Sequence, residues 1–149
     1  FSLLLFVILI IDFVTVNLTC PISCTWSNDE KNKIGELEVL LNNELQGLDI
    51  LCCTENWLNK IEINSYQIKI FNLSSCFCCT TYKNGGSAIY VEKKLLHKEK
   101  SQTYYLHQER TFEHAVTEIK NKNSCITIAC MYRSPECCLK TFLNILKFS

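Results

Sequence analysis

The sequence has no excess of charge of either sign, since 15 lysines and arginines are matched by 15 aspartates and glutamates. It therefore lacks the strong basic excess that is the simplest sign of a nucleic-acid-binding protein, although a local basic patch on a neutral chain can still hold DNA. Apolar residues make up 48% of the chain and charged residues 20%, a balance that argues against intrinsic disorder. The 149 residues are enough for one domain with a sizeable core.

The N-terminal apolar run is too short for a membrane-spanning helix. It covers residues 1–11 and ends at Asp12, whereas a span needs about 20 apolar residues. The run resembles the apolar part of a signal peptide, but no basic segment precedes it. We therefore treat residues 1–25 as an apolar N-terminal segment: a first buried strand, a leader, or sequence outside the domain. Because the chain starts with Phe1 rather than methionine, we also expect it to be a piece of a longer protein.

The sequence contains eleven cysteines, an unusually large number, and they could form disulfides, bind zinc or lie buried as free thiols. A secreted disulfide framework normally has an even number of cysteines in a shorter, loop-rich chain, whereas several here lie in apolar, strand-like runs. Residues 76–79 form a candidate zinc knuckle, although no convincing second pair of ligands accompanies it. Free cysteine behaves as a small buried hydrophobe. That interpretation suits Cys52, Cys53, Cys125 and Cys130. An intracellular location, in the nucleus or the cytoplasm, is therefore favoured over secretion.

The predicted elements are a helix, a strand-rich middle and a second helix, without internal repeats or low-complexity linkers. Ser27 and Glu30 have the spacing of a capping box, apolar residues then recur at helical steps, and Gly47 is the expected stop. Strands are predicted at residues 48–54, 66–71, 87–91, 113–119 and 125–132. The charged residues 93–100 are expected to be solvated, and residues 139–146 to form the second helix. A helix followed at once by a buried strand is an α/β signal.

Glu55 is the first candidate for a chemical role. It comes directly after the apolar run at residues 48–54, where a carboxylate is held rigidly and faces a cleft. Magnesium prefers oxygen ligands, and one or two protein carboxylates commonly suffice. A glutamate after a strand is, taken alone, most often a solvated loop residue, so the wider pattern decides the interpretation.

That wider pattern is an ordered set of short segments. They are residues 32–38 (NKIGELE), 48–51 (LDIL), 54–58 (TENWL), 85–91 (GGSAIYV) and 131–135 (MYRSP). In this order and spacing they resemble the N-terminal half of the endonuclease/exonuclease/phosphatase family, specifically the endonuclease domain of insect-type non-LTR retrotransposons. The resemblance covers residues 26–146, and the partial domain is expected to span residues 26–149.

The resemblance implies an α/β fold, a four-layered α-β-β-α sandwich, which is incomplete in this chain. It also implies a magnesium-dependent enzyme that nicks DNA by phosphodiester hydrolysis. DNA would be the partner of the complete form, with a reverse transcriptase domain in cis and no stable protein partner. Glu55 matches the metal-binding glutamate of the family, and Tyr132 matches the tyrosine that contacts the phosphate. Arg133 stands where the family has a basic residue and would bind substrate phosphate or pair with a neighbouring carboxylate. Glu113 falls near a recurrent family glutamate and is assigned no role.

The sequence also departs from the family pattern. Trp26 occupies the position of an asparagine that helps to build the metal site, and tryptophan has no acceptor oxygen. The chain ends at Ser149, before the family's Gly-Asp-x-Asn segment and its late Asp-His pair, which orient the nucleophile and act as general base. Because such groups act as a unit, we expect a truncated or degenerate endonuclease with weak or absent nicking. The alternative is a secreted cysteine-rich binding protein without enzymatic activity.

Overall fold

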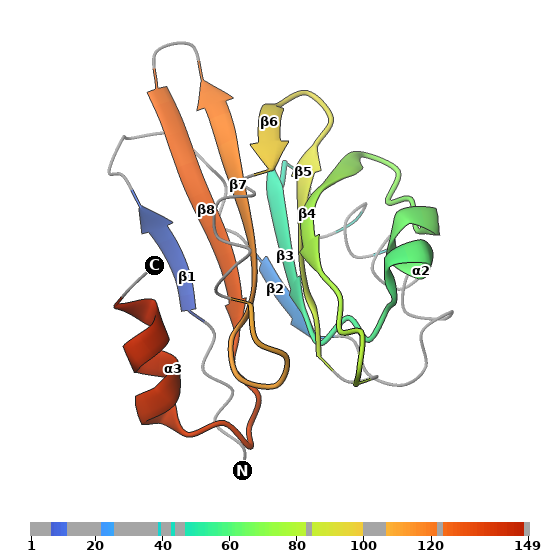
Figure 1. The fold of residues 1–149 in the computed structure, drawn as a ribbon. Helices are drawn as coiled ribbons and strands as arrows, with labels where there is room; N and C mark the ends of the chain where they lie inside the picture. The colour runs from blue at the N-terminus through green and yellow to red at the C-terminus, as the bar shows by residue number, and fades with distance from the viewer. Residues whose placement is uncertain are drawn as a thin grey trace.

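The computed structural model describes residues 7–11, 22–25, 39, 43, 47–82, 85–99, 107–121 and 124–147. Within these ranges the chain is mostly β, with eight strands in two four-stranded sheets and two short helices (Figure 1). The expected α/β class and the four-layered α-β-β-α sandwich are therefore wrong. Helices α2 (Lys60–Ser65) and α3 (Leu139–Leu146) are only about 9 and 12 Å long at 1.5 Å per residue, too short to cover a four-stranded sheet as a layer.

The first sheet is entirely antiparallel and has the strand order β1-β8-β7-β6. Its strands are β1 (Val7–Ile11), β6 (Leu96–Glu99), β7 (Glu113–Asn121) and β8 (Ser124–Tyr132). The strands predicted at residues 113–119 and 125–132 are confirmed, and they form one long hairpin. The charged stretch at residues 93–100 contains the unpredicted edge strand β6, whose residues are nonetheless mostly exposed.

The second sheet has the order β2-β3-β5-β4, in which β2 runs parallel to β3 and the other neighbours are antiparallel. Its strands are β2 (Ile22–Thr25), β3 (Ile50–Thr54), β4 (Phe71–Phe77) and β5 (Ser87–Glu92). All five residues of β3 are buried, because alternate side chains enter two different clusters. Leu51 and Cys53 join the cluster that also contains Ile63 of α2, whereas Ile50 and Cys52 face the first sheet.

The core between the two sheets is built from small and branched apolar residues. It comprises Ile50, Cys52, Ile89 and Val91 of the second sheet and Ala115, Ile119, Ile126, Ile128 and Cys130 of the first. A further cluster joins α3 to the first sheet, with Phe142 packed against Phe112 at 5.3 Å between ring centroids. Figure 1 shows the helices at the outer sides of the two sheets, α2 beside β4 and α3 beside β1 and β8.

The strand predicted at residues 66–71 is wrong. Helix α2 ends at Ser65, and the chain then turns, with the Phe71 N–H donating to the Ile68 carbonyl at 2.9 Å as β4 begins. The alternation of apolar residues led to the wrong prediction of a strand, because Ile68 is buried by the turn while Ile70 remains 38% exposed. A local signal for α2 was present, since Asn59 and Glu62 form a complete capping box.

The predicted helix at residues 27–46 lies almost entirely outside the described residues, as does Trp26. Val39 and Asn43 are described and are helical. Gly47 has a φ of +86°, the left-handed conformation typical of the residue after a helix. None of the helices in the described ranges is long and apolar enough to cross a membrane.

Nine of the described cysteines are reduced, without a disulfide bond. Cys52, Cys53 and Cys130 are buried in the core, which confirms the prediction for them. Cys125 is exposed, so the same prediction was wrong there. It alternates along β8 with the buried Ile126, and its side chain therefore points away from the core.

Candidate functional site

A polar cavity of about 380 Å³ opens where strands of the two sheets end. Glu55 follows β3 of the second sheet, whereas Glu113 and Tyr132 are paired neighbours at the open end of the β7–β8 hairpin. The lining residues are Glu55, Trp57, Tyr82, Arg110, Glu113, Tyr132, Ser134, Pro135 and Glu136. The volume is in the range of small-ligand sites, so one nucleotide-sized group is a reasonable occupant.

Glu55 reaches the cavity through an unusual backbone path. Both Glu55 and Trp57 have a φ of +53°, a left-handed conformation that costs a non-glycine residue roughly 1–3 kcal/mol and often marks functional sites. The path is held by the opposite turn, since the Glu55 N–H donates to the Gly86 carbonyl at 2.8 Å and the Trp57 N–H to the Gly85 carbonyl at 3.0 Å. Surrounding structure therefore fixes the direction of the carboxylate.

Tyr132 makes the central contact of the cavity. It is the last residue of β8, and its hydroxyl donates a 2.6 Å hydrogen bond to Oε1 of Glu55. Burial first, and then the neighbouring Glu55 carboxylate, raise the pKa of Tyr132 well above its usual value. The phenol consequently stays protonated and acts as a donor. The structure thus brings together the two residues that the sequence resemblance marked as metal ligand and phosphate contact.

Glu113 stabilises the surroundings of Glu55 and Tyr132 through hydrogen bonds to two loops. It is fully buried, and its Oε1 accepts from the Arg110 N–H at 2.8 Å while its Oε2 accepts from the Gly86 N–H at 2.5 Å. Burial is the largest effect on this carboxyl and raises its pKa, against the lowering effect of these hydrogen bonds. Because backbone N–H groups occupy both oxygens, Glu113 positions two loops around the cavity.

Two glycines allow the turn at residues 85–86 to approach the side chains of Glu113 and Asn56 closely. Gly85 has a φ of +115° and Gly86 a φ of +90°. A Cβ at Gly85 would lie 2.6 Å from Oε2 of Glu113, and one at Gly86 would lie 2.5 Å from Oδ1 of the buried Asn56. Only glycine lets this turn approach both side chains so closely.

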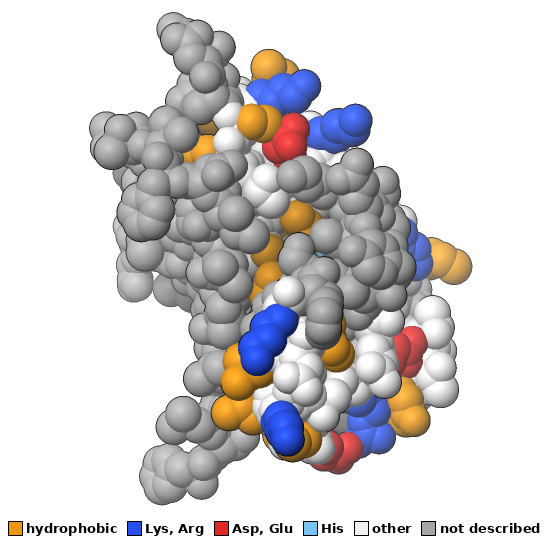
Figure 2. Space-filling model, turned by 60° about the vertical axis from the view of Figure 1, so that its left-hand side comes forward, with side chains coloured by type: hydrophobic (Ala, Val, Ile, Leu, Met, Phe, Trp, Pro, Cys, Tyr) orange, Lys and Arg blue, Asp and Glu red, His pale blue; other side chains and the backbone are white. Residues whose placement is uncertain are grey.

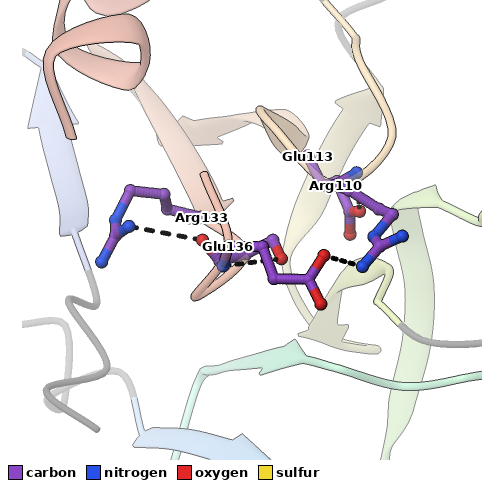
Figure 3. A network of polar contacts seen from close by, with 5 residues as sticks. Arg110, Glu113, Arg133 and Glu136 are labelled. Carbon is purple, nitrogen blue, oxygen red and sulfur yellow. Dashed lines mark hydrogen bonds and ion pairs between the residues drawn. The ribbon is translucent and has the colours of Figure 1, made fainter. Parts of the chain in front are cut away.

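The cation beside the cavity is Arg110, which the sequence analysis did not select. Its guanidinium pairs with Glu136 and lies 4.7 Å from the centroid of the Tyr82 ring. Arg133, the predicted phosphate contact, instead donates to the Cys137 carbonyl at 2.5 Å and does not line the cavity. Figure 3 shows the two arginines on opposite sides of Glu136. No sequence signal distinguished Arg110, because its position depends on the loop that Glu113 holds.

On the face shown in Figure 2, the coloured Lys and Arg side chains are interspersed with acidic and apolar ones. Arg110 is the only cation among the described lining residues of the cavity. Any phosphate bound there would meet one guanidinium and the Tyr132 hydroxyl.

One residue of the cavity, Glu55, offers the carboxylate oxygens that a hard cation such as magnesium prefers. Glu113 is occupied by backbone donors and Glu136 is paired with Arg110, which leaves Glu55 as the carboxylate for a metal. Magnesium accepts such a site, because it retains several waters and takes further oxygens from substrate phosphate. Among the residues that the structure describes, no cluster of three or more His, Cys, Asp or Glu side chains could hold a metal ion, and the candidate zinc knuckle at residues 76–79 is no exception.

No protein-family model matches the chain, and no curated protein matches it. The expected membership of the endonuclease/exonuclease/phosphatase family therefore stays a prediction. The function has to be inferred from the cavity and from the residues that line it.

Proposed function

We propose that this chain carries part of a magnesium-dependent DNA endonuclease, in degenerate form, and that the cavity at Glu55 takes one phosphodiester of a DNA strand. The observation that carries the proposal is the 2.6 Å hydrogen bond from Tyr132 to Glu55. These residues are 77 positions apart and belong to different sheets. The resemblance assigns Glu55 to the metal and Tyr132 to the phosphate from two separate sequence segments, and their contact supports a single site for both roles.

Magnesium bound at Glu55 would polarise a phosphoryl oxygen and lower the pKa of its bound water. Tyr132 orients the Glu55 carboxylate through the single proton of its hydroxyl, and this proton would turn to the negative charge that develops on a phosphate oxygen once magnesium occupies Glu55. The two groups therefore act on one phosphate from adjacent positions.

Arg110 gives the cavity its affinity for phosphate in this proposal. Its side chain is 39% exposed and its partner Glu136 is 69% exposed, so their ion pair is worth about 0–1 kcal/mol. A phosphate can displace Glu136 at little cost and offers two oxygens to the planar guanidinium. Trp57 and Tyr82 also line the cavity and are side chains of the kind that stack with a base.

We expect this cavity to hydrolyse DNA only weakly. Among the described lining residues, Glu55 is the one carboxylate that is held neither by backbone N–H groups nor by an arginine, and no histidine is among them. A site without a positioned general base loses most of its rate enhancement, because catalytic groups act as a unit. We therefore expect efficient nicking of DNA only from a complete form of the domain, with a reverse transcriptase domain in cis. The nine reduced cysteines support an intracellular location.

The test is the magnesium dependence of DNA binding, measured by fluorescence anisotropy of a labelled duplex. At matched ionic strength, the chain should bind the duplex more tightly with MgCl₂ than with EDTA, by several-fold, because a phosphate oxygen and Glu55 share the metal. Glu55→Gln should remove this difference while preserving the shape of the side chain.

Glu62→Gln is the matched control. Glu62 is exposed on α2, and glutamine can replace glutamate in its capping box. This variant should keep the full magnesium effect. If Glu55→Gln kept it too, or if plasmid nicking survived Glu55→Ala, Glu55 would not be the metal ligand and the proposed function would fail.

A further inference from the structure

A second cluster of reactive groups lies on β4, outside the cavity. Nζ of Lys60, in the first turn of α2, is 3.1 Å from Sγ of Cys76. Cys78 lies one residue beyond the end of β4 and packs against the same apolar cluster as Cys76. Cys76 is 7% exposed and Cys78 is half-buried, at the edge strand of the second sheet. None of the three residues lines the cavity.

The surroundings of Cys76 stabilise a thiolate. A hydrogen bond from Cys78 is the largest effect, and with the Lys60 ammonium it lowers the pKa of Cys76 to about 6, although burial and the Glu99 carboxylate of β6 oppose this. The contact with Cys76 in turn raises the pKa of Lys60, so the ammonium keeps its charge. The pKa of Cys78 is raised, chiefly by Cys76, so Cys78 remains a protonated donor.

We propose that Cys76 is a nucleophilic thiolate, held beside the Lys60 ammonium, and is a modification site that small hydroperoxides oxidise to a sulfenic acid. The reactive form of cysteine is the thiolate, and a neighbouring cation in a partly exposed setting is the usual way of stabilising it. The inference does not depend on the proposed nuclease function.

The oxidation is a two-electron transfer. The Cys76 sulfur attacks one oxygen of the hydroperoxide, an S–O bond forms, and the O–O bond breaks. The leaving hydroxide or alkoxide takes a proton from water, and the sulfur emerges as a sulfenic acid. The sulfur is oxidised and the peroxide is reduced, so no further reactant is needed. At 7% exposure the sulfur favours a small oxidant over a bulky disulfide.

The sulfenic acid should persist long enough to be trapped. Condensation with Cys78 would release water and form a disulfide, but residues two apart in an extended chain have Cα atoms separated by about 6.6 Å. That separation is near the upper end of the range for disulfides, so dimedone present during the oxidation should compete with closure.

The test is trapping with dimedone after brief exposure to less than one equivalent of hydrogen peroxide at neutral pH, with each cysteine mapped by mass spectrometry. Cys76 should be labelled about tenfold more than the exposed Cys125. Lys60→Met should lower the labelling of Cys76 about tenfold, whereas Lys60→Arg should restore it. Lys69→Met, which changes another exposed lysine, is the matched control and should leave the labelling unchanged.

A pH profile of the wild-type chain provides a second test that needs no variant. Alkylation of Cys76 by iodoacetamide should reach half its maximal rate near pH 6, as its lowered pKa requires. Site mapping separates it from Cys138, an exposed cysteine whose pKa is also lowered, by backbone N–H groups of α3. Labelling of Cys76 that does not exceed that of Cys125, or that is unchanged in Lys60→Met, would overturn the proposal.

Discussion

Replacing Gly85 with alanine tests the structural basis of the cavity. Gly85 carries the carbonyl that holds Trp57, and its φ of +115° is a conformation that alanine rarely adopts. An added Cβ would lie 2.6 and 2.8 Å from the two carboxyl oxygens of Glu113. Both distances are below van der Waals contact, so Glu113 or the turn must move.

The expected cost follows from two effects. The backbone strain of a non-glycine residue at this φ is roughly 1–3 kcal/mol. Moving Glu113 also disturbs its hydrogen bonds from Gly86 and Arg110, and leaving a buried donor unsatisfied costs about 1–3 kcal/mol. Together these effects should lower the unfolding free energy of the Gly85→Ala variant by about 2–6 kcal/mol.

Gly47→Ala is the matched comparison for this prediction. Gly47 has a similar positive φ of +86°, but a Cβ there meets no atom within 4 Å. The variant should lose only the conformational cost, about 1–2 kcal/mol. Urea unfolding of both variants measures the difference, provided that their m-values agree. Equal losses would refute the claim that Glu113 and this turn are packed as tightly as described.

Two further predictions concern the hydroxyl of Tyr132 and the imidazole of His107. Tyr132→Phe removes the hydrogen bond to Glu55 and should lower the unfolding free energy by about 1–2 kcal/mol in urea; an unchanged value would contradict a formed bond. Burial lowers the pKa of His107 from 6.5 to about 4, so its contribution to stability is present above pH 6.5 and is lost as the pH falls toward 4. Between pH 6.5 and pH 4, the unfolding free energy of His107→Asn should therefore fall less than that of the wild type. An equal fall in the two proteins would contradict this prediction.

The strands were predictable where their residues are buried on both faces or alternate strictly. Residues 48–54 and 87–91 are mostly apolar because β3 and β5 lie inside the second sheet. The failure at residues 66–71 arose because a turn buries Ile68 without extending the chain. The fold class failed for a different reason: it was taken from a family resemblance, whereas the described chain pairs its strands mainly as antiparallel neighbours with only two short helices.

The candidate site was predictable in part. Glu55 and Tyr132 belong to local segments whose residue types indicate their chemistry, and the structure brings both to one cavity. Arg110 and Glu113 could not be assigned roles in this way, because both roles depend on contacts between distant loops. The Glu113 carboxylate reaches 27 residues back along the chain to Gly86, and no pattern within either segment reports that contact.

The most direct test of the proposed site uses Mn²⁺ as a paramagnetic substitute for Mg²⁺ and follows the ¹H–¹⁵N spectrum of the chain. Broadening should appear first at the amides of Glu55, Asn56 and Tyr132, which surround the cavity, and Glu55→Gln should abolish it. Broadening centred on the exposed Glu62 of α2, or an unchanged pattern in Glu55→Gln, would contradict a metal site at this carboxylate.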